Sequence, residues 1–410
     1  LVGSEMCIRD SMHAAVAARH DDLLEAVIEE YGAPASRSAW MASYPAEVIA
    51  QAIEALEAFE FVTPAGAATV QMTPLGVAGL ITPWNSDAGF ICGKLAAALA
   101  AGCTAVIKPS EMSALQTQIV TEALRDAALP PGVFNIVTGR GETVGETISR
   151  HPDVAKISFT GSTNTGKAIL RNAAESFKRV TLELGGKSPT ILLDDVDLAQ
   201  AIPLVIQAGF MNSGQACVAG TRILVPYSRK AEIETALAQA VAAVKSGDPR
   251  NSATDVGPMV SEKQWLRVQG YIRKGIEEGA RLLAGGEGRP DGTRDGWFVR
   301  PTLFADVNNR MTIARDEIFG PVLCVIPYQD EAEAIAIAND TEYGLSAMVL
   351  GGDVDRARRV AQQIVSGRVL VNTLAHEPKA PFGGFKHSGV GREMGEWGIR
   401  AFMEPRSMVG

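Results

Sequence analysis

Cysteine and histidine are scarce in this chain, and their scarcity narrows the kinds of site that it can hold. The 410 residues include 5 cysteines and 5 histidines, with no C-x-x-C spacing and no histidine near a cysteine at metal-ligand spacing. A disulfide framework and a zinc centre are therefore not expected, and we predict no metal site. So few thiols also favour a reducing compartment, and we expect the protein in the cytoplasm.

Long apolar runs and basic clusters are also lacking. The most apolar stretch, residues 90–107, contains Lys94 and Gly102, which favours a helix, a turn and a buried strand over a membrane span. The 38 Lys and Arg residues are outnumbered by 47 Asp and Glu residues, for a net charge of -9. The sequence therefore predicts neither a membrane nor a nucleic acid as partner.

The first ten residues, LVGSEMCIRD, are similar to a translated sequencing adapter. We therefore expect residues 1–11 to be an artefact, joined to a gene whose beginning was lost. They are left out of the fold prediction for that reason.

Alternating apolar segments fill the rest of the chain, whose hydrophobic content of 46% is enough for more than one core. Residues 12–61 have a helical pattern, with a second helix from about residue 45 to 59, and residues 62–70 form an extended arm. Strands are predicted at residues 76–82, 105–107, 133–137, 154–159, 190–193 and 222–226. Helices are predicted at residues 113–128, 144–149, about 165–176, 198–211, 230–245 and 264–278, and a surface loop at 285–296. This alternation predicts an α/β fold of two doubly wound parallel-sheet lobes that meet near residue 186.

Two residues suggest covalent chemistry. Cys217 follows small and polar residues (NSGQA, 212–216), a setting that suits an exposed nucleophile, although a packing cysteine is the alternative. Glu183 ends an apolar strand and precedes Gly185 and Gly186. Partial burial there would raise its pKa toward that of a general base, whereas a salt-bridged glutamate at a strand end is the alternative.

Three further segments follow predicted strands and are candidate ligand contacts. Asn85 could stabilise an oxyanion, or simply form a turn. Residues 161–166 (GSTNTG) precede a helix, as a phosphate-binding turn does, although helix capping alone explains them equally well. Lys108 and Glu111 could bind ribose hydroxyls, and the glutamate would disfavour the extra phosphate of NADP; a capped loop is the alternative.

In this order, the segments resemble the aldehyde dehydrogenase superfamily from about residue 13 to residue 409. The resemblance is carried by the strings ITPWN (81–85), KPSE (108–111), FTGST (159–163), ELGGK (183–187), GQAC (214–217), EIFGP (317–321) and PFGG (381–384). The interval from Glu183 to Cys217 (217 − 183 = 34) is also similar to that of the family.

The resemblance implies a catalytic set. Cys217 would attack the aldehyde, Asn85 and the Cys217 backbone N–H would hold the oxyanion, and Glu183 would activate water to hydrolyse the resulting thioester. Lys94 and Glu393 would be supporting charges near the site. The product would be a carboxylic acid. The alternatives are a CoA-acylating semialdehyde dehydrogenase, which generally lacks this glutamate, and an inactive truncated relative.

The resemblance also implies NAD, with NADP as the alternative, as cofactor. Lys108 and Glu111 would contact the adenosine ribose, Ser162 the pyrophosphate, and Glu317 with Phe319 the nicotinamide ribose and ring. The remaining cofactor contacts implied by the matching strings are Ile81, Trp84, Ser110, Gly161, Leu184 and Gly185.

The family likeness further implies domains and assembly. Residues 12–61 and 78–185 would form the cofactor-binding domain without its N-terminal strands, and residues 186–397 the catalytic domain. Residues 62–77 and 398–410 would form an oligomerisation arm of a homodimer or homotetramer. Residues 86–88 (SDA) depart from the family pattern, so we expect an acidic group near the substrate tunnel. The chain is locally similar to bacterial members that act on aliphatic or oxo-acid aldehydes.

Overall fold

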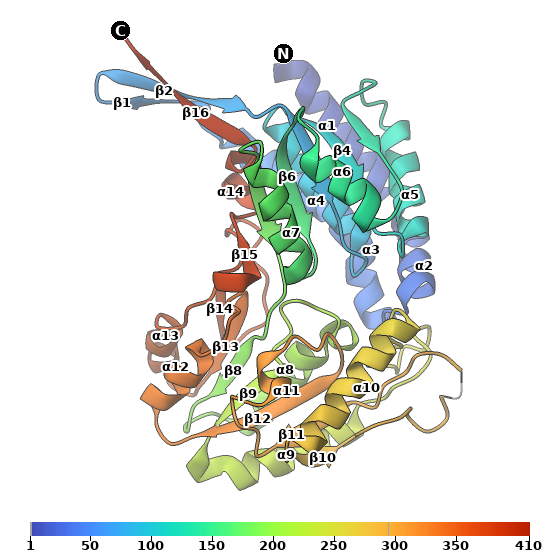
Figure 1. The fold of residues 1–410 in the computed structure, drawn as a ribbon, viewed down its shortest axis with the longest axis vertical. Helices are drawn as coiled ribbons and strands as arrows, with labels where there is room; N and C mark the ends of the chain where they lie inside the picture. The colour runs from blue at the N-terminus through green and yellow to red at the C-terminus, as the bar shows by residue number, and fades with distance from the viewer. Residues whose placement is uncertain (1, 294) are drawn as a thin grey trace.

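Two successive runs of strand–helix alternation form two separate α/β lobes, which confirms the predicted fold class. The computed structural model describes residues 2–293 and 295–410, with side chains from residue 10 on. Residue 1 of the expected artefact lies outside the described residues, and residues 2–11 belong to helix α1 (Val2–Ala17). Figure 1 shows the first lobe above the second, with a β arm that projects from the first.

The first lobe is built on a six-stranded sheet in the order β15-β7-β6-β3-β4-β5. Five of its strands are parallel, and β15 is antiparallel to β7. Parallel strands with both faces covered read as continuous apolar runs, which is why the sequence pattern located the strands at residues 77–81, 104–108, 134–136 and 154–160. Their bounds are β3 (Val77–Ile81), β4 (Thr104–Lys108), β5 (Phe134–Ile136), β6 (Val154–Thr160), β7 (Arg179–Glu183) and β15 (Gly389–Val390).

Helices α4 (Asp87–Ala100), α5 (Ala114–Asp126), α6 (Glu146–Arg150) and α7 (Thr163–Ala174) connect these strands. A π-helical turn at Gly141–Gly145 precedes α6. Helices α1, α2 (His20–Tyr31) and α3 (Ala35–Glu57) pack against α4 and α5 as an additional layer. The prediction of a helix starting near Pro45 was wrong, because α3 begins at Ala35 and continues through this proline. Burial of Pro45 and the packing of α3 on α4 offset the hydrogen bond that proline cannot make.

The second lobe contains a seven-stranded sheet in the order β10-β11-β12-β9-β8-β13-β14, parallel except for β10. Its strands are β8 (Pro189–Leu192), β9 (Arg222–Pro226), β10 (Arg281–Ala284), β11 (Thr302–Ala305), β12 (Val322–Tyr328), β13 (Ser346–Leu350) and β14 (Arg368–Val371). Its helices are α8 (Leu198–Phe210), α9 (Lys230–Ala243), α10 (Glu262–Glu277), α11 (Thr312–Arg315), α12 (Glu331–Asn339) and α13 (Val354–Ala361). A core of aliphatic side chains from both faces holds these elements together.

The C-terminal segment returns to the first lobe before the predicted boundary at residue 397. Strand β15 pairs with β7, and α14 (Gly395–Arg400) contacts α3 and α4. The arm is a three-stranded antiparallel sheet of β1 (Val62–Ala65), β2 (Ala68–Pro74) and β16 (Met403–Val409). Residues 398–400, predicted to be part of the arm, are instead the end of α14.

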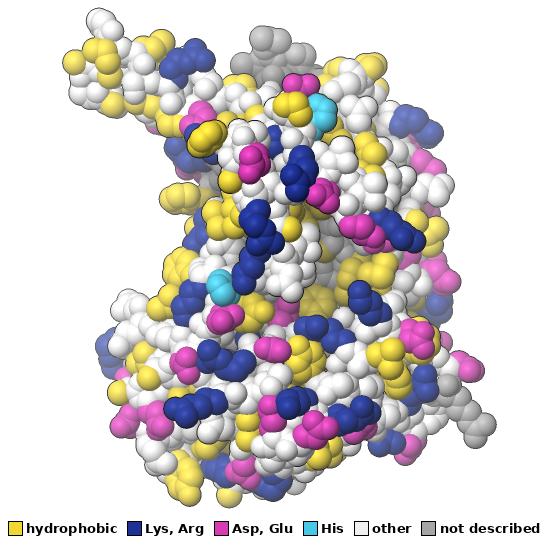
Figure 2. All heavy atoms as spheres, in the orientation of Figure 1, with side chains coloured by type: hydrophobic (Ala, Val, Ile, Leu, Met, Phe, Trp, Pro, Cys, Tyr) yellow, Lys and Arg dark blue, Asp and Glu magenta, His cyan; other side chains and the backbone are white. Residues whose placement is uncertain are grey.

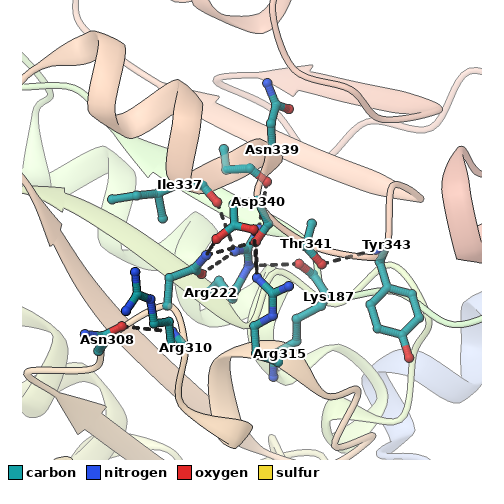
Figure 3. A network of polar contacts seen from close by, with 12 residues as sticks. Lys187, Arg222, Asn308, Arg310, Arg315, Ile337, Asn339, Asp340, Thr341 and Tyr343 are labelled. Atoms are coloured by element: carbon teal, nitrogen blue, oxygen red, sulfur yellow. Dashed lines mark hydrogen bonds and ion pairs between the residues drawn. The ribbon is translucent and has the colours of Figure 1, made fainter.

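A buried arginine joins separate elements of the second lobe (Figure 3). The fully buried Arg222 donates through Nε to the Lys187 carbonyl at 3.1 Å and through Nη2 to the Ala338 carbonyl at 2.8 Å. Its Nη1 donates to Asn309 Oδ1 at 2.7 Å and to the Ile337 carbonyl at 3.1 Å. Arg222 therefore connects β9 by hydrogen bonds to the end of α12 and to the loop before α11.

Charges of both signs are interspersed over the face of the molecule that Figure 2 shows, as expected for a chain without basic clusters. Among the described residues, no helix is long and apolar enough to cross a membrane.

Candidate active site

The carboxyl ends of the parallel strands in the first sheet bring several predicted site residues to one edge. In the strand register, Ile81 lies beside both Lys108 and Phe159, and Thr160 lies beside Glu183. Open α/β sheets bind ligands at this edge. Adjacent strands therefore explain why motifs about 25 to 75 residues apart in the sequence meet.

A cavity of about 430 Å³ contains all the residues predicted to be catalytic. Asn85 reaches it from the segment between β3 and α4, Glu183 from the end of β7, and Cys217 from the loop after α8. Lys94 of α4 and Glu393 also line it. The structure thus brings together five side chains that the sequence distributes over more than 300 residues.

The loop that presents Cys217 has an unusual backbone. Asn212, Ser213 and Gly214 have φ values of 53°, 59° and 74°, in the left-handed region that costs energy for residues with a side chain. A Cβ on Gly214 would lie 2.2 Å from the carbonyl oxygen of Gly320, so only glycine fits there.

Side-chain amides hold this loop in place. Asn85 Nδ2 and Asn212 Nδ2 donate to the Gln215 carbonyl oxygen at 3.2 and 3.1 Å. Gln215 Oε1 in turn accepts a hydrogen bond from the Val260 N–H at 3.0 Å. The Asn85 amide is therefore held beside the segment that carries Cys217.

The surroundings of the half-buried Cys217 favour the thiol over the thiolate. Burial, followed by the charges of Glu317 and Glu183, raises its pKa to about 12, while Arg368 and the cysteine's own backbone N–H favour the thiolate. The predicted nucleophile therefore does not ionise readily on its own. A base, or the loss of negative charge nearby, must accompany ionisation of this thiol.

Glu183 is a carboxyl group without polar partners. It is 3% exposed, and neither of its side-chain oxygens has a hydrogen-bond partner within residues 2–293 and 295–410. Burial, and then the charge of Glu393, raises its pKa well above the ordinary value, against the opposing charges of Lys94 and Arg392. A carboxyl group with a raised pKa is a stronger base once ionised, as a general base requires.

Lys94 and Glu393 form an ion pair in the wall of the cavity. The ammonium group of Lys94 contacts Glu393 Oε1 and donates to Ser158 Oγ at 3.0 Å, and Ser158 Oγ donates to the same carboxylate oxygen at 2.9 Å. The buried Lys94 holds the Glu393 carboxylate in place, within electrostatic reach of Glu183.

The residues predicted to bind a cofactor lie outside the cavity lining. Lys108 Nζ pairs with Glu111 Oε2 at 2.9 Å, and this bond lowers the pKa of Glu111 despite its partial burial. Ser110 Oγ accepts a hydrogen bond from the Met112 N–H at 3.2 Å, which stabilises the turn that contains Glu111.

The loop between β6 and α7 has a helix N-terminus as expected. Ser162 is the N-cap of α7, and its Oγ accepts the Thr165 N–H at 3.3 Å. The Gly161 N–H donates to the Glu183 carbonyl oxygen at 3.0 Å, which links this loop to the strand end that carries the candidate base.

Glu317 and Phe319 of the second lobe reach across to the first. Glu317 Oε1 accepts the Gly186 N–H at 3.0 Å, and a Cβ on Gly185 would lie 2.4 Å from Glu317 Oε2. Burial raises the pKa of Glu317 to about 7. The rings of Phe319 and Trp84 meet edge to face with centroids 5.7 Å apart.

The last two predicted cofactor residues are buried in the sheet. Ile81 ends β3 and Leu184 follows β7, and both belong to one apolar cluster of the first lobe. A Cβ on Gly166 of α7 would lie 2.6 Å from Leu184 Cδ2, so the helix packs closely on this residue.

The acidic residue expected near the substrate tunnel, Asp87, does not itself line the cavity. Asp87 is fully buried and turned away from the cavity, where its carboxyl group accepts hydrogen bonds from Thr82 Oγ1 and, at 3.4 Å, from Thr117 Oγ1. Burial raises the pKa of Asp87 to about 8. Its neighbour Ser86, the N-cap residue of α4, lines the cavity.

Several cavity residues had no signal in the sequence. Part of the wall comes from α3 and from the segment around β14, neither of which carries a recognisable motif. The polar and aromatic residues of this wall are Arg37, Trp40, Tyr44, Arg368 and His376. Throughout the described ranges, no group of three or more His, Cys, Asp or Glu residues could hold a metal ion.

Comparison with known proteins assigns the family. The profile of the aldehyde dehydrogenase family matches residues 7–408. A Staphylococcus haemolyticus protein whose name assigns it provisionally to the aldehyde dehydrogenases is 48% identical over 394 residues, which are 96% of this chain and 83% of that protein.

Two solved structures are similar over nearly all of this chain. Aldehyde dehydrogenase C from Pseudomonas syringae, as a cysteine-to-alanine variant with NAD+ and octanal, is 45% identical with a TM-score of 0.97 and covers 99% of this chain and 84% of its own. A Mycobacterium tuberculosis aldehyde dehydrogenase in complex with NAD+ is 42% identical with a TM-score of 0.96, covering 99% and 85%. The chain therefore belongs to the aldehyde dehydrogenase family of NAD(P)-using oxidoreductases.

Proposed function

We propose that this chain oxidises an aldehyde to a carboxylic acid through a thioester on Cys217, with NAD(P)+ as oxidant. One observation supports the proposal above all others: the Cys217 thiol, the Asn85 amide and the Glu183 carboxyl group line one cavity. A nucleophile, an oxyanion donor and a base are the groups that such a reaction requires.

Cys217 acts first. Its thiol gives up its proton to solvent, and the charge of Arg368 and the Cys217 backbone N–H favour the resulting thiolate. The sulfur then forms a bond to the aldehyde carbon while the carbonyl π electrons move to oxygen. The Asn85 Nδ2–H group and the Cys217 backbone N–H stabilise the resulting oxyanion.

NAD(P)+, when bound, accepts the hydride that leaves the aldehyde carbon. As that C–H bond breaks, the oxyanion electrons restore the C=O bond and a thioester remains on Cys217. Glu183 then takes a proton from a water molecule that attacks the thioester carbon, the C–S bond breaks, and the acid is released. The pair of Lys94 and Glu393 holds charge beside Glu183 during this proton transfer.

The residues on the carboxyl edge of the first sheet fit a dinucleotide. The Lys108–Glu111 pair offers a donor and an acceptor for ribose hydroxyls, and the N-terminus of α7 at Ser162 offers backbone N–H groups to a pyrophosphate. Glu317 would bind the second ribose. The solved relatives bound to NAD+ support this cofactor.

The arm suits assembly with a second copy of the chain. The outer strand β16 exposes most of its length, including Met408 and Val409. Exposed strand edges pair with other strands, so we infer a homodimer or homotetramer formed through the arm.

The test is NADH formation with a panel of aldehydes, with the acid identified as product. Cys217→Ala should abolish NADH formation, and persistent activity would contradict the proposal. Addition of CoA should leave the free acid as the product. Accumulation of acyl-CoA would show instead that the thioester is passed to a thiol.

A further inference from the structure

Two arginines of the cavity lining have no acidic partner among the described residues. Arg37 of α3 and Arg368 of β14 both line the cavity and are half-buried. Arg37 Nε is buried without a hydrogen-bond partner, and neither guanidinium group forms an ion pair with any residue that the structure describes. Arg368 makes one side-chain hydrogen bond, from Nε to Ser346 Oγ at 3.2 Å.

Aromatic rings hold these guanidinium groups in position. Arg37 stacks on Trp40 with its Cζ atom 3.9 Å from the ring centroid, and Arg368 lies 6.0 Å from the centroid of Phe382. After burial, both arginines contribute to the lowered pKa of His376. The two cations are therefore close to the same imidazole and face one part of the cavity.

The acidic residues of the cavity lining form no ion pair with either arginine. They are Glu183 and Glu393, and Glu393 is already paired with Lys94. Arg368 is within electrostatic reach of Cys217, whereas Arg37 is not among the groups that shift the pKa of this thiol. Arg37 therefore lies farther from the reacting sulfur than Arg368 does.

Desolvated cations without counterions are costly, and burial accordingly lowers the pKa of both arginines. An anionic ligand would offset this cost. The planar guanidinium fork matches the two oxygens of a carboxylate, and the apolar side chains of Met41 and Val48 in the same cavity suit methylene groups.

We infer that the substrate is an aldehyde with a carboxylate at the opposite end of a short chain, an ω-oxo acid, whose carboxylate binds Arg37 and Arg368. The aldehyde carbon then meets Cys217. This inference rests on the proposed oxidation and adds the substrate class.

The experiment measures kcat/KM for three ω-oxo acids, namely 4-oxobutanoate, 5-oxopentanoate and 6-oxohexanoate, and for the alkanals of equal length, namely butanal, pentanal and hexanal. At least one oxo acid should exceed the alkanal of equal length by about tenfold or more, and its KM should rise with salt. Arg37→Gln should lower the oxo-acid to alkanal ratio by about 10- to 100-fold, mainly through KM. Arg37→Lys should recover part of the ratio, and Arg368→Gln provides an independent second variant.

Arg310→Gln is the matched control, since Arg310 is exposed and lies outside the cavity lining. Binding of pentanoate, which has no aldehyde, is measured separately by saturation-transfer NMR. It should be lost in Arg37→Gln and kept in Arg310→Gln.

The two proposals fail in different ways. NADH formation that favours alkanals and ignores both cavity arginines would overturn the substrate class and leave the oxidation standing. No NADH from any aldehyde, with pentanoate binding still dependent on Arg37, would overturn the oxidation and retain the anion site. Pentanoate binding that is equal in all variants would overturn the anion site.

Discussion

Gly186 and Cys217 are in backbone contact: a Cβ on Gly186 would lie 2.3 Å from the Cys217 carbonyl oxygen. No real side chain tolerates this distance to a backbone atom. Gly186, three residues after the candidate base Glu183, therefore allows the segment that follows β7 to touch the loop that carries the candidate nucleophile.

Gly186→Ala should displace this loop and reduce kcat by about 100-fold, because small misplacements of a reacting group are costly. Forced overpacking should also lower stability by roughly 1–3 kcal/mol. Steady-state kinetics and thermal melting measure the two effects.

The control is Gly270→Ala in the exposed middle of α10, where a Cβ meets nothing within 4 Å. This variant should keep full activity and gain roughly 0.5–1 kcal/mol of stability. Equal activity of both variants would show that the contact does not position Cys217.

Glu183→Gln should separate the two halves of the reaction. The first turnover should still give a burst of NADH, while steady-state turnover should slow by about 10²- to 10⁴-fold because water lacks its base. Stopped-flow absorbance measures the burst and the steady rate together.

The pH dependence provides a second measurement on Glu183. Its pKa is raised, so turnover in the wild type should fall as the pH falls through that raised value and the carboxylate becomes protonated. This limb should be missing in Glu183→Gln and unchanged in Glu60→Gln, an exposed control. Loss of the burst would mean that Glu183 also serves the thiol, as its effect on the pKa of Cys217 allows.

The elements that the sequence located best were those whose pattern is local. The parallel strands are largely apolar in their interiors, and the charged residues that end them, such as Lys108 and Glu183, stand out. Their meeting at one sheet edge follows from topology alone. The candidate nucleophile was located by its small and polar neighbours together with a family resemblance.

Other features depend on contacts between distant segments. Helix α3 continues through Pro45 because of its packing, and β15 joins the first sheet beside Glu183 although over 200 residues separate them. The burial of Asp87 depends on packing beside Thr82 and Thr117, and the raised pKa of Cys217 depends on burial and on charges from other segments. A single sequence contains no local pattern for any of these.

Asp87→Asn should change how stability depends on pH. The folded carboxyl group has a pKa of about 8 against the ordinary value of 3.8, so the folded chain keeps a proton that the unfolded chain releases. Its contribution to stability is complete below about pH 4 and is lost as the pH rises to about 8. The neutral amide should remove this loss.

Thermal melting at pH 5 and pH 8 measures this difference. The wild type should lose more stability between the two values than Asp87→Asn does. Asp291→Asn, whose side chain is fully exposed, should behave like the wild type. An identical pH profile for Asp87→Asn and the wild type would indicate that Asp87 is ionised in the folded chain.

Arg222→Met should be among the most destabilising single changes in the second lobe. The thioether fills a similar space but leaves the carbonyl groups of Lys187, Ile337 and Ala338 without their donor. Breaking a buried charged network of this kind costs roughly 3–5 kcal/mol. The melting temperature should fall sharply, and the soluble yield with it.

Arg310→Met, at an exposed arginine of the neighbouring loop, should leave the melting temperature within error of the wild type. Because Arg222 does not line the cavity, the folded fraction of Arg222→Met should keep the wild-type KM. A large change in KM at normal stability would instead assign Arg222 a part in substrate binding.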